Sequence, residues 1–145
     1  MFKKFFKTED DSSSFILRVM LGAVMFPHGA QLLFGWFGGR GFEATMTGFT
    51  TSMGLTPLVA FLVIMAESLG ALSLILGFMT RLCAFGLGSV MTGAIVLVHW
   101  RYGFFMNWSG TQAGNGFEYH LLAIAIAVAL VIKGGGRWSV DGQLV

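Results

Sequence analysis

Apolar positions form four long runs along the chain, separated by short polar stretches. The runs extend over approximately residues 15–36, 57–77, 82–100 and 117–133. A helix that crosses a bilayer needs about 20 predominantly apolar residues, and each run is close to that length and carries few charges. The second and third runs are joined by a tight turn, whereas the connections 37–56 and 101–116 are long. The pattern predicts an all-α integral membrane protein with four antiparallel transmembrane helices in one bundle.

The first long connection has a helical pattern of its own. Phe42, Met46 and Phe49 recur at helical spacing, and Gly54 and Pro57 follow them. Apolar residues at this spacing lie on one face of a helix. We therefore expect a short interfacial helix in the first outer loop, within a single membrane domain of residues 1–145.

The composition narrows the class of protein. Of 145 residues, 55% are hydrophobic and 11% are charged, with a formal net charge of +2, and the mean hydropathy is +0.76. An ordinary soluble domain is about 25% charged. Soluble enzymes and nucleic-acid-binding modules are therefore excluded. The only cysteine, Cys83, cannot form a disulfide within the chain.

The basic residues predict how the helices are oriented. One side of the bundle would carry Lys3, Lys4, Lys7, Arg81, Lys133 and Arg137, and the other only Arg40 and Arg101. The positive-inside rule then places both termini in the cytoplasm. Aromatic residues at the opposite ends fit a membrane-interface belt: Trp36, Trp100 and Trp108. Arg18 lies just inside the first run, and we expect both Arg18 and Arg81 to extend to lipid phosphates.

Polar groups inside the runs carry the candidate chemistry, because ionisable side chains in a membrane are costly and often functional. The four helices contribute one each to the outer half: His28, Glu67, His99 and Glu118. Gln31 shares the helix face of His28. Glu67 lies about 15 Å from the start of its run, near the midplane. These five residues are the candidate ligand contacts of an outer-half polar pocket.

Each candidate also has a structural interpretation. The Glu67 carboxyl could accept protons or contact a ligand, or it could join helices by hydrogen bonds to His28 or to backbone. Glu118 and His120 lie about 200° apart around a helix, which argues against a shared metal ion. His28 and His120 differ in depth, which argues against a bis-histidine haem. We therefore predict no metal site and no intrinsic cofactor.

Several short motifs, in order along most of the chain, resemble the DoxX family. They include Arg18-Val19, His28-Gly29, Leu33-Phe34-Gly35-Trp36, Gly54-Leu55-Thr56-Pro57, Glu67, Thr80-Arg81, His99, Gly103-Phe104-Phe105, Glu118-Tyr119 and Ser139-Val140-Asp141. The resemblance implies a small four-helix bacterial membrane protein. Its similarity to the DoxD subunit of thiosulfate:quinone oxidoreductase implies quinone-linked redox work.

Three functions are compatible with these features. The first is a redox-associated membrane subunit whose pocket binds a quinone or a similar apolar molecule; it could belong to a quinone-linked oxidoreductase. The second is a non-catalytic accessory subunit of a larger respiratory or photosynthetic complex. The third is a small-solute or proton-coupled carrier with Glu67 as the coupling group. The expected partners are the lipid bilayer, a larger membrane complex or further copies of the chain, and not nucleic acid.

Overall fold

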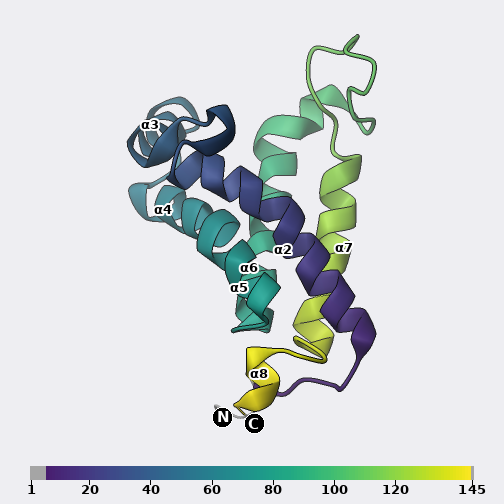
Figure 1. Ribbon diagram of the computed structural model, residues 1–145. Helices are drawn as coiled ribbons and strands as arrows, with labels where there is room; N and C mark the ends of the chain where they lie inside the picture. The colour runs from purple at the N-terminus through teal and green to yellow at the C-terminus, as the bar shows by residue number, and fades with distance from the viewer. Residues whose placement is uncertain (1–5, 145) are drawn as a thin grey trace.

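The computed structural model describes residues 6–144, where the regular secondary structure is helical, with no strand (Figure 1). Lys3 and Lys4 lie outside the described residues. Some neighbouring elements follow one another without a break and form one longer helix, with a π-helical or 3-10 segment inside it or at its end. In chain order the elements are α2 (Ser12–Leu33), η1 (Trp36–Gly38), α3 (Gly41–Thr47), η2 (Gly48–Ser52), α4 (Pro57–Met65), η3 (Ala66–Gly70), α5 (Ala71–Leu76), α6 (Thr80–Ala94), η4 (Ile95–His99), η5 (Trp100–Tyr102), α7 (Glu118–Lys133) and α8 (Val140–Gln143).

Within the described residues, three helices are long and apolar enough to cross a membrane. They are Ser12–Leu33, Pro57–Leu76 and Thr80–Tyr102, close to the first three predicted runs. The fourth run also forms a helix, but α7 has only 16 residues. At 1.5 Å per residue it is about 24 Å long, which is shorter than the roughly 30 Å hydrocarbon core of a bilayer. The helix in the first loop is present as α3 and its π-helical continuation η2.

The helix ends follow local signals in the sequence. The Asp11 side chain accepts a hydrogen bond of 2.9 Å from the backbone N–H of Ser13 and caps the start of α2. Thr56 caps α4, which begins with Pro57, a residue suited to a first helical turn. Gly77 ends α5 with φ 71°, the left-handed conformation that favours glycine. These caps satisfy backbone groups that a helix end otherwise leaves unpaired.

Glycines allow α2 to lie directly against the second long helix. A Cβ on Gly22 would come within 2.6 Å of the carbonyl oxygen of Ala71, and a Cβ on Gly29 would collide with the backbone of Glu67 and Ser68. Small residues permit this close approach in membranes, where packing rather than the hydrophobic effect joins helices. The core continues between α2, α5, α6 and α7 through Leu21, Met25, Leu74, Leu87, Met91, Ala127 and Leu130.

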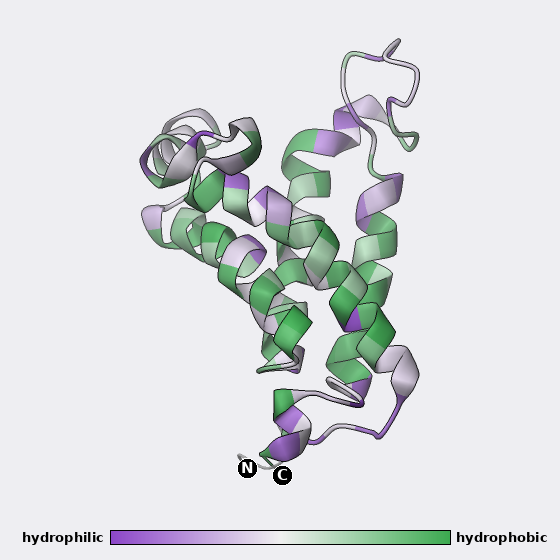
Figure 2. Ribbon diagram, in the orientation of Figure 1, coloured by the Kyte–Doolittle hydropathy of each residue, from purple (hydrophilic) through white to green (hydrophobic). Residues whose placement is uncertain are grey.

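Both described ends of the chain lie at the same end of the molecule (Figure 1). Figure 2 shows mainly apolar helices, with hydrophilic residues gathered at this end and around the long loop at the opposite end. Two ion pairs join the segment before α2 to the end of α7 and the segment that follows it: Lys133 Nζ lies 2.6 Å from Asp11 Oδ2, and Arg137 Nε lies 2.8 Å from Asp10 Oδ1. These ion pairs hold the two described ends of the chain together.

The structure corrects the prediction that Arg18 extends to lipid phosphates. Its side chain does not extend to lipid phosphate but is buried, with 1% of the residue exposed. The guanidinium donates hydrogen bonds to five backbone carbonyls, those of Leu74, Ile75, Gly135, Arg137 and Trp138. The first two belong to the C-terminal turn of α5, where unpaired carbonyls favour a cation. Arg18 thus joins α2, the end of α5 and the C-terminal segment.

Arg81 and Asp141 complete this junction. Arg81 donates to the carbonyls of Val131 and Ile132 at the end of α7 and to the carbonyl of Lys7. The Asp141 carboxylate accepts hydrogen bonds from the backbone N–H groups of Met79, at 2.8 Å, and Thr80, at 2.9 Å. It caps the start of α6 from a position 61 residues away from Thr80. Charged side chains near this end therefore fasten helix termini and backbone.

Candidate functional site

An apolar groove of about 820 Å³ lies between the Pro57–Leu76 and Thr80–Tyr102 helices. Phe49, Met53 and Leu55 contribute to its wall from the first loop. Most of the remaining wall is aliphatic or aromatic. The polar or ionisable lining residues are few: Glu67, Ser73, Cys83 and Ser89.

Glu67 differs from these neighbours because its carboxyl has no hydrogen bond or ion pair within residues 6–144. By contrast, Ser89 Oγ donates to the carbonyl of Phe85 at 2.8 Å, and Cys83 bonds to the carbonyl of Phe78 and interacts with Ser73. Tyr119 of α7 lies within electrostatic reach of Glu67. Glu67 is therefore the polar group of the groove that is available to a ligand.

Local helix geometry places Glu67 in the groove. It belongs to η3, a π-helical turn between two α-helical segments. Such turns add a residue to one helical turn and are frequent at functional sites. On the opposite side of the same turn, the backbone of Glu67 and Ser68 packs against Gly29 of α2, and Ser68 Oγ donates to the carbonyl of Ile64. The turn is thus held by α2 while its carboxyl lines the groove.

The structure places the other predicted ligand contacts elsewhere. His28, Gln31, His99 and Glu118 do not line the groove. His28 is exposed on α2. Gln31 Nε2 donates to the carbonyl of Phe37 at 3.1 Å and supports the turn after α2. Of the five candidates, only Glu67 belongs to the groove.

Glu118 supports the long loop between η5 and α7. Its Oε1 accepts hydrogen bonds from the backbone N–H of Met106, at 2.8 Å, and from Trp108 Nε1, at 3.3 Å. Backbone hydrogen bonds close the same loop, including Gly116 N–H to the carbonyl of Phe105 at 3.1 Å. This connection is therefore an ordered loop, and both hydrogen bonds that Glu118 Oε1 accepts come from residues of the loop.

His99 lies beside a residue that the sequence reasoning set aside, His120. Their ring centroids are 4.2 Å apart, with an angle of 42° between the planes. His99 Nδ1 lies 2.8 Å from the carbonyl oxygen of Asn115. His120 is buried, with 7% of the residue exposed, and its Nδ1 has no hydrogen-bond partner in the described part of the chain. The sequence offers one sign that the two histidines are close: both lie where their helices meet the loop 103–117.

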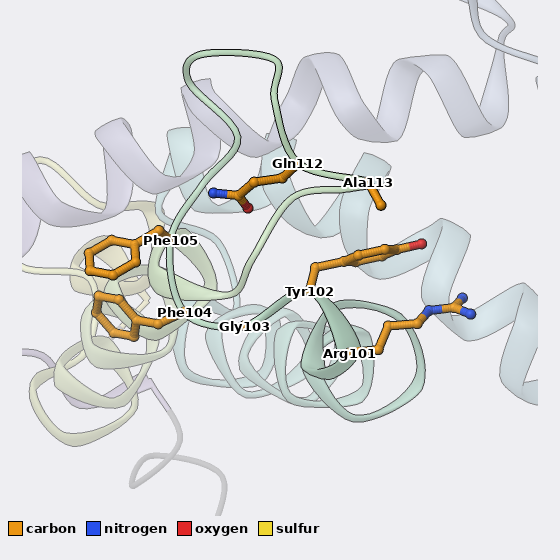
Figure 3. A pocket seen from close by; sticks show the side chains of 7 residues that line it. All are labelled: Arg101, Tyr102, Gly103, Phe104, Phe105, Gln112 and Ala113. Carbon is orange, nitrogen blue, oxygen red and sulfur yellow. The ribbon is translucent and has the colours of Figure 1, made fainter.

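A second, smaller hollow of about 320 Å³ lies at the same loop and contains none of the predicted ligand contacts. Figure 3 shows the Tyr102 ring above the Arg101 side chain, with Gln112 and Ala113 on the loop facing them and the Phe104 and Phe105 rings to one side. The hollow is open and shares no residue with the groove.

The predicted interface tryptophans Trp36, Trp100 and Trp108 are all exposed. Trp100 stacks on Phe117, with ring centroids 5.5 Å apart. Lys7 is also exposed, but its backbone carbonyl accepts hydrogen bonds from Arg81. Contact of these residues with a membrane interface stays a prediction.

The comparisons with known proteins give one match. The sequence model of the DoxX family matches residues 13–100, which is more than half of the chain and includes α2 from its second residue, the groove and His99. Neither the curated proteins nor the solved structures contain a significant match. The family is one of membrane proteins, in agreement with the apolar helices.

Proposed function

We propose that this chain, which belongs to the DoxX family, is a redox-associated membrane subunit that binds a quinone in the groove beside Glu67. One observation carries the proposal: the Glu67 carboxyl, without a hydrogen bond or ion pair among the described residues, lines a mainly apolar groove of about 820 Å³. Small-molecule sites are hollows of about 300–1,000 Å³ with mainly apolar walls and a few polar groups that orient the ligand.

A quinone matches both parts of the groove. Its ring carries two carbonyl acceptors, and its isoprenoid tail is apolar. A protonated Glu67 carboxyl would donate a hydrogen bond to one ring carbonyl, and the tail would lie along the aliphatic walls. A carboxyl in this position can also transfer a proton to or from the ring oxygen.

The reaction that such a site supports is the two-electron, two-proton interconversion of a quinone and its quinol. Glu67 would exchange one of the two protons at the ring oxygen it contacts, and the other ring oxygen would exchange the second proton with water. The electrons would come from, or go to, a partner protein in a larger membrane oxidoreductase. The proposed role of this chain is therefore to hold and protonate the quinone.

We also propose that α7 joins the three long helices in crossing a bacterial inner membrane, with both described chain ends on the cytoplasmic side. The end that carries the chain termini also carries Lys7, Arg81, Lys133 and Arg137, which supports this orientation. The ordered loop before α7 and the first-loop helix α3 would then face outward.

Purification of the full chain from its native membrane in mild detergent tests the proposal. Mass spectrometry would identify bound lipids and proteins together. We expect a quinone to be retained by wild type and by Glu67→Gln, whose amide still donates a hydrogen bond. We expect Glu67→Leu to lower quinone affinity by up to about tenfold, the value of one hydrogen bond of about 1.4 kcal/mol.

Two further variants serve as controls for the groove. Ser89→Ala should retain quinone, because the Ser89 hydroxyl already bonds to the carbonyl of Phe85. Gly93→Phe should exclude quinone by filling the groove, because Gly93 lines it and a Cβ at this position meets no neighbour within 4 Å. A stable co-purifying complex with no quinone in any preparation would contradict the proposal and favour the accessory-subunit function.

A further inference from the structure

We infer that His99 and His120 form a binding site for a divalent transition-metal ion, with Cu²⁺ bound most tightly. The site lies at the loop end of the bundle, separate from the Glu67 groove, and the inference does not depend on quinone binding. Three observations carry it: the orientation of His99, the unsatisfied nitrogen of His120 and the closeness of the two rings.

The hydrogen bond of His99 determines which of its nitrogens is free. Its Nδ1 lies 2.8 Å from the carbonyl oxygen of Asn115. A carbonyl only accepts hydrogen bonds, so Nδ1 carries the proton and the neutral ring presents the lone pair of Nε2. Metal-binding histidines commonly donate their other N–H to a backbone carbonyl in this way, which orients the ring and raises its basicity.

The loop holds that carbonyl in place. Asn115 Oδ1 accepts a hydrogen bond from the backbone N–H of Asn107 at 3.3 Å. Asn107 in turn exchanges two hydrogen bonds of 3.0 Å with the backbone of Gln112. The Glu118 carboxylate accepts from Met106 and Trp108 in the same loop. The orientation of His99 is therefore supported before any ion binds.

His120 supplies the second nitrogen. It is more than nine-tenths buried, and its Nδ1 has no hydrogen-bond partner within residues 6–144. A buried polar atom without a partner is uncommon and calls for an explanation such as a bound ion. The ring lies against His99, with centroids 4.2 Å apart. A metal–nitrogen bond is about 2.0–2.1 Å long, so one ion can bind two imidazoles only if the two rings are neighbours, as they are here.

The donor set indicates the class of ion. Imidazole nitrogens suit copper, zinc and nickel, whereas Mg²⁺ and Ca²⁺ prefer oxygen ligands. Within the described residues, no group of three or more His, Cys, Asp or Glu side chains is placed to hold an ion. The protein would therefore supply two ligands and leave the other positions to water or an incoming ligand. Divalent affinities should follow the order in which Cu²⁺ exceeds Ni²⁺ and Zn²⁺.

Calorimetric titration of the full chain, purified without a polyhistidine tag, tests the inference. Wild type should bind one Cu²⁺ per chain, with nitrogen hyperfine splitting in the electron paramagnetic resonance spectrum, and should not bind Mg²⁺. His99→Ala and His120→Ala should each weaken Cu²⁺ binding at least about tenfold. The matched control is His28→Ala, because the remaining histidine is exposed on α2, and it should bind as wild type does.

Several results would overturn the inference. They are Cu²⁺ binding that is unchanged in His99→Ala, binding that is lost in His28→Ala, and weak non-saturating binding that marks an adventitious ion only. His99 is partly exposed, so its variant gives a readout even if His120→Ala fails to fold. Saturable binding should also weaken in acid, because protons compete for the imidazole nitrogens.

Discussion

The guanidinium of Arg18 donates a hydrogen bond of 2.7 Å to the carbonyl oxygen of Gly135, 117 residues further along the chain. The same side chain also bonds to the carbonyls of Leu74 and Ile75. One buried cation therefore connects the first helix, the end of α5 and the segment after α7. This junction holds the end of the bundle opposite the histidine pair.

Replacement of Arg18 by Gln should destabilise the fold strongly. The shorter, neutral amide cannot reach five carbonyls, and each hydrogen bond to a charged donor contributes about 1.5–3 kcal/mol. We expect a loss of about 3 kcal/mol or more in the free energy of unfolding, measured by denaturation in detergent. Arg40→Gln is the control, because Arg40 is exposed and should change stability by less than about 0.5 kcal/mol. Equal stability of the two variants would contradict the role of Arg18.

The Asp141 carboxylate should stabilise the start of α6. Asp141→Ala removes the acceptor for the N–H groups of Met79 and Thr80. Loss of such a cap costs about 0.5–2 kcal/mol. Hydrogen exchange followed by mass spectrometry should show faster exchange in the peptide that contains Met79 and Thr80. Glu43→Ala, at an exposed position, should leave that peptide unchanged; similar exchange in Asp141→Ala and wild type would disprove the cap.

Two glycine substitutions should have opposite effects on stability. Gly29→Ala places a Cβ against the backbone of Glu67 and Ser68, and such overpacking costs about 1–3 kcal/mol. Gly93→Ala meets no atom within 4 Å and should be neutral or stabilise its helix by up to about 1 kcal/mol. Thermal unfolding of both variants in the same detergent measures the difference. A Gly29→Ala protein as stable as Gly93→Ala would show that α2 does not approach η3 this closely.

Stability should fall in acid because of Asp11. Its hydrogen bonds from Lys133 and from the backbone N–H of Ser13 hold the pKa of the Asp11 carboxyl well below its ordinary value of 3.8. Arg137 lowers the pKa of Asp10 in the same way. A carboxylate with a lowered folded-state pKa stabilises the fold above its unfolded-state pKa, and this contribution is lost as the pH falls further.

Asn at position 11 tests this dependence, because Asn also caps helices well but carries no charge. At pH 7 the melting temperature of Asp11→Asn should lie below that of wild type. The difference between the two should shrink as the pH falls below about 4, since protonation removes the same charge from wild type. A difference that stays constant down to pH 2.5 would show that the Asp11 charge does not stabilise the fold.

The helices could be predicted from the sequence because apolar runs, prolines and glycines determine the backbone conformation of their own segment. Pro57 begins a helix and Gly77 ends one, as their residue types favour. Arg18 was not recognisable as buried, because its partners are backbone carbonyls of a distant segment and leave no pattern in residue types.

The candidate site was predictable only in part, for a geometric reason. Spacing gives the depth of a residue in a membrane but not the rotation of its helix. The midplane carboxyl Glu67 was identified from depth and does line a groove. Glu118, at a similar depth to His99, instead faces its own loop. On the sequence alone, His120 was considered as a metal ligand together with Glu118 on the same helix. In the structure its ring lies beside His99, which belongs to a different helix.

Photolabelling with an azidoquinone tests the quinone site most directly. The full chain in lipid nanodiscs would be labelled and digested, and the modified peptides identified by mass spectrometry. We expect the label in segments that line the groove, 62–70 or 82–98, and we expect Gly93→Phe to abolish it. Labelling of the loop hollow at residues 101–113, or equal labelling of wild type and Gly93→Phe, would contradict a quinone site beside Glu67.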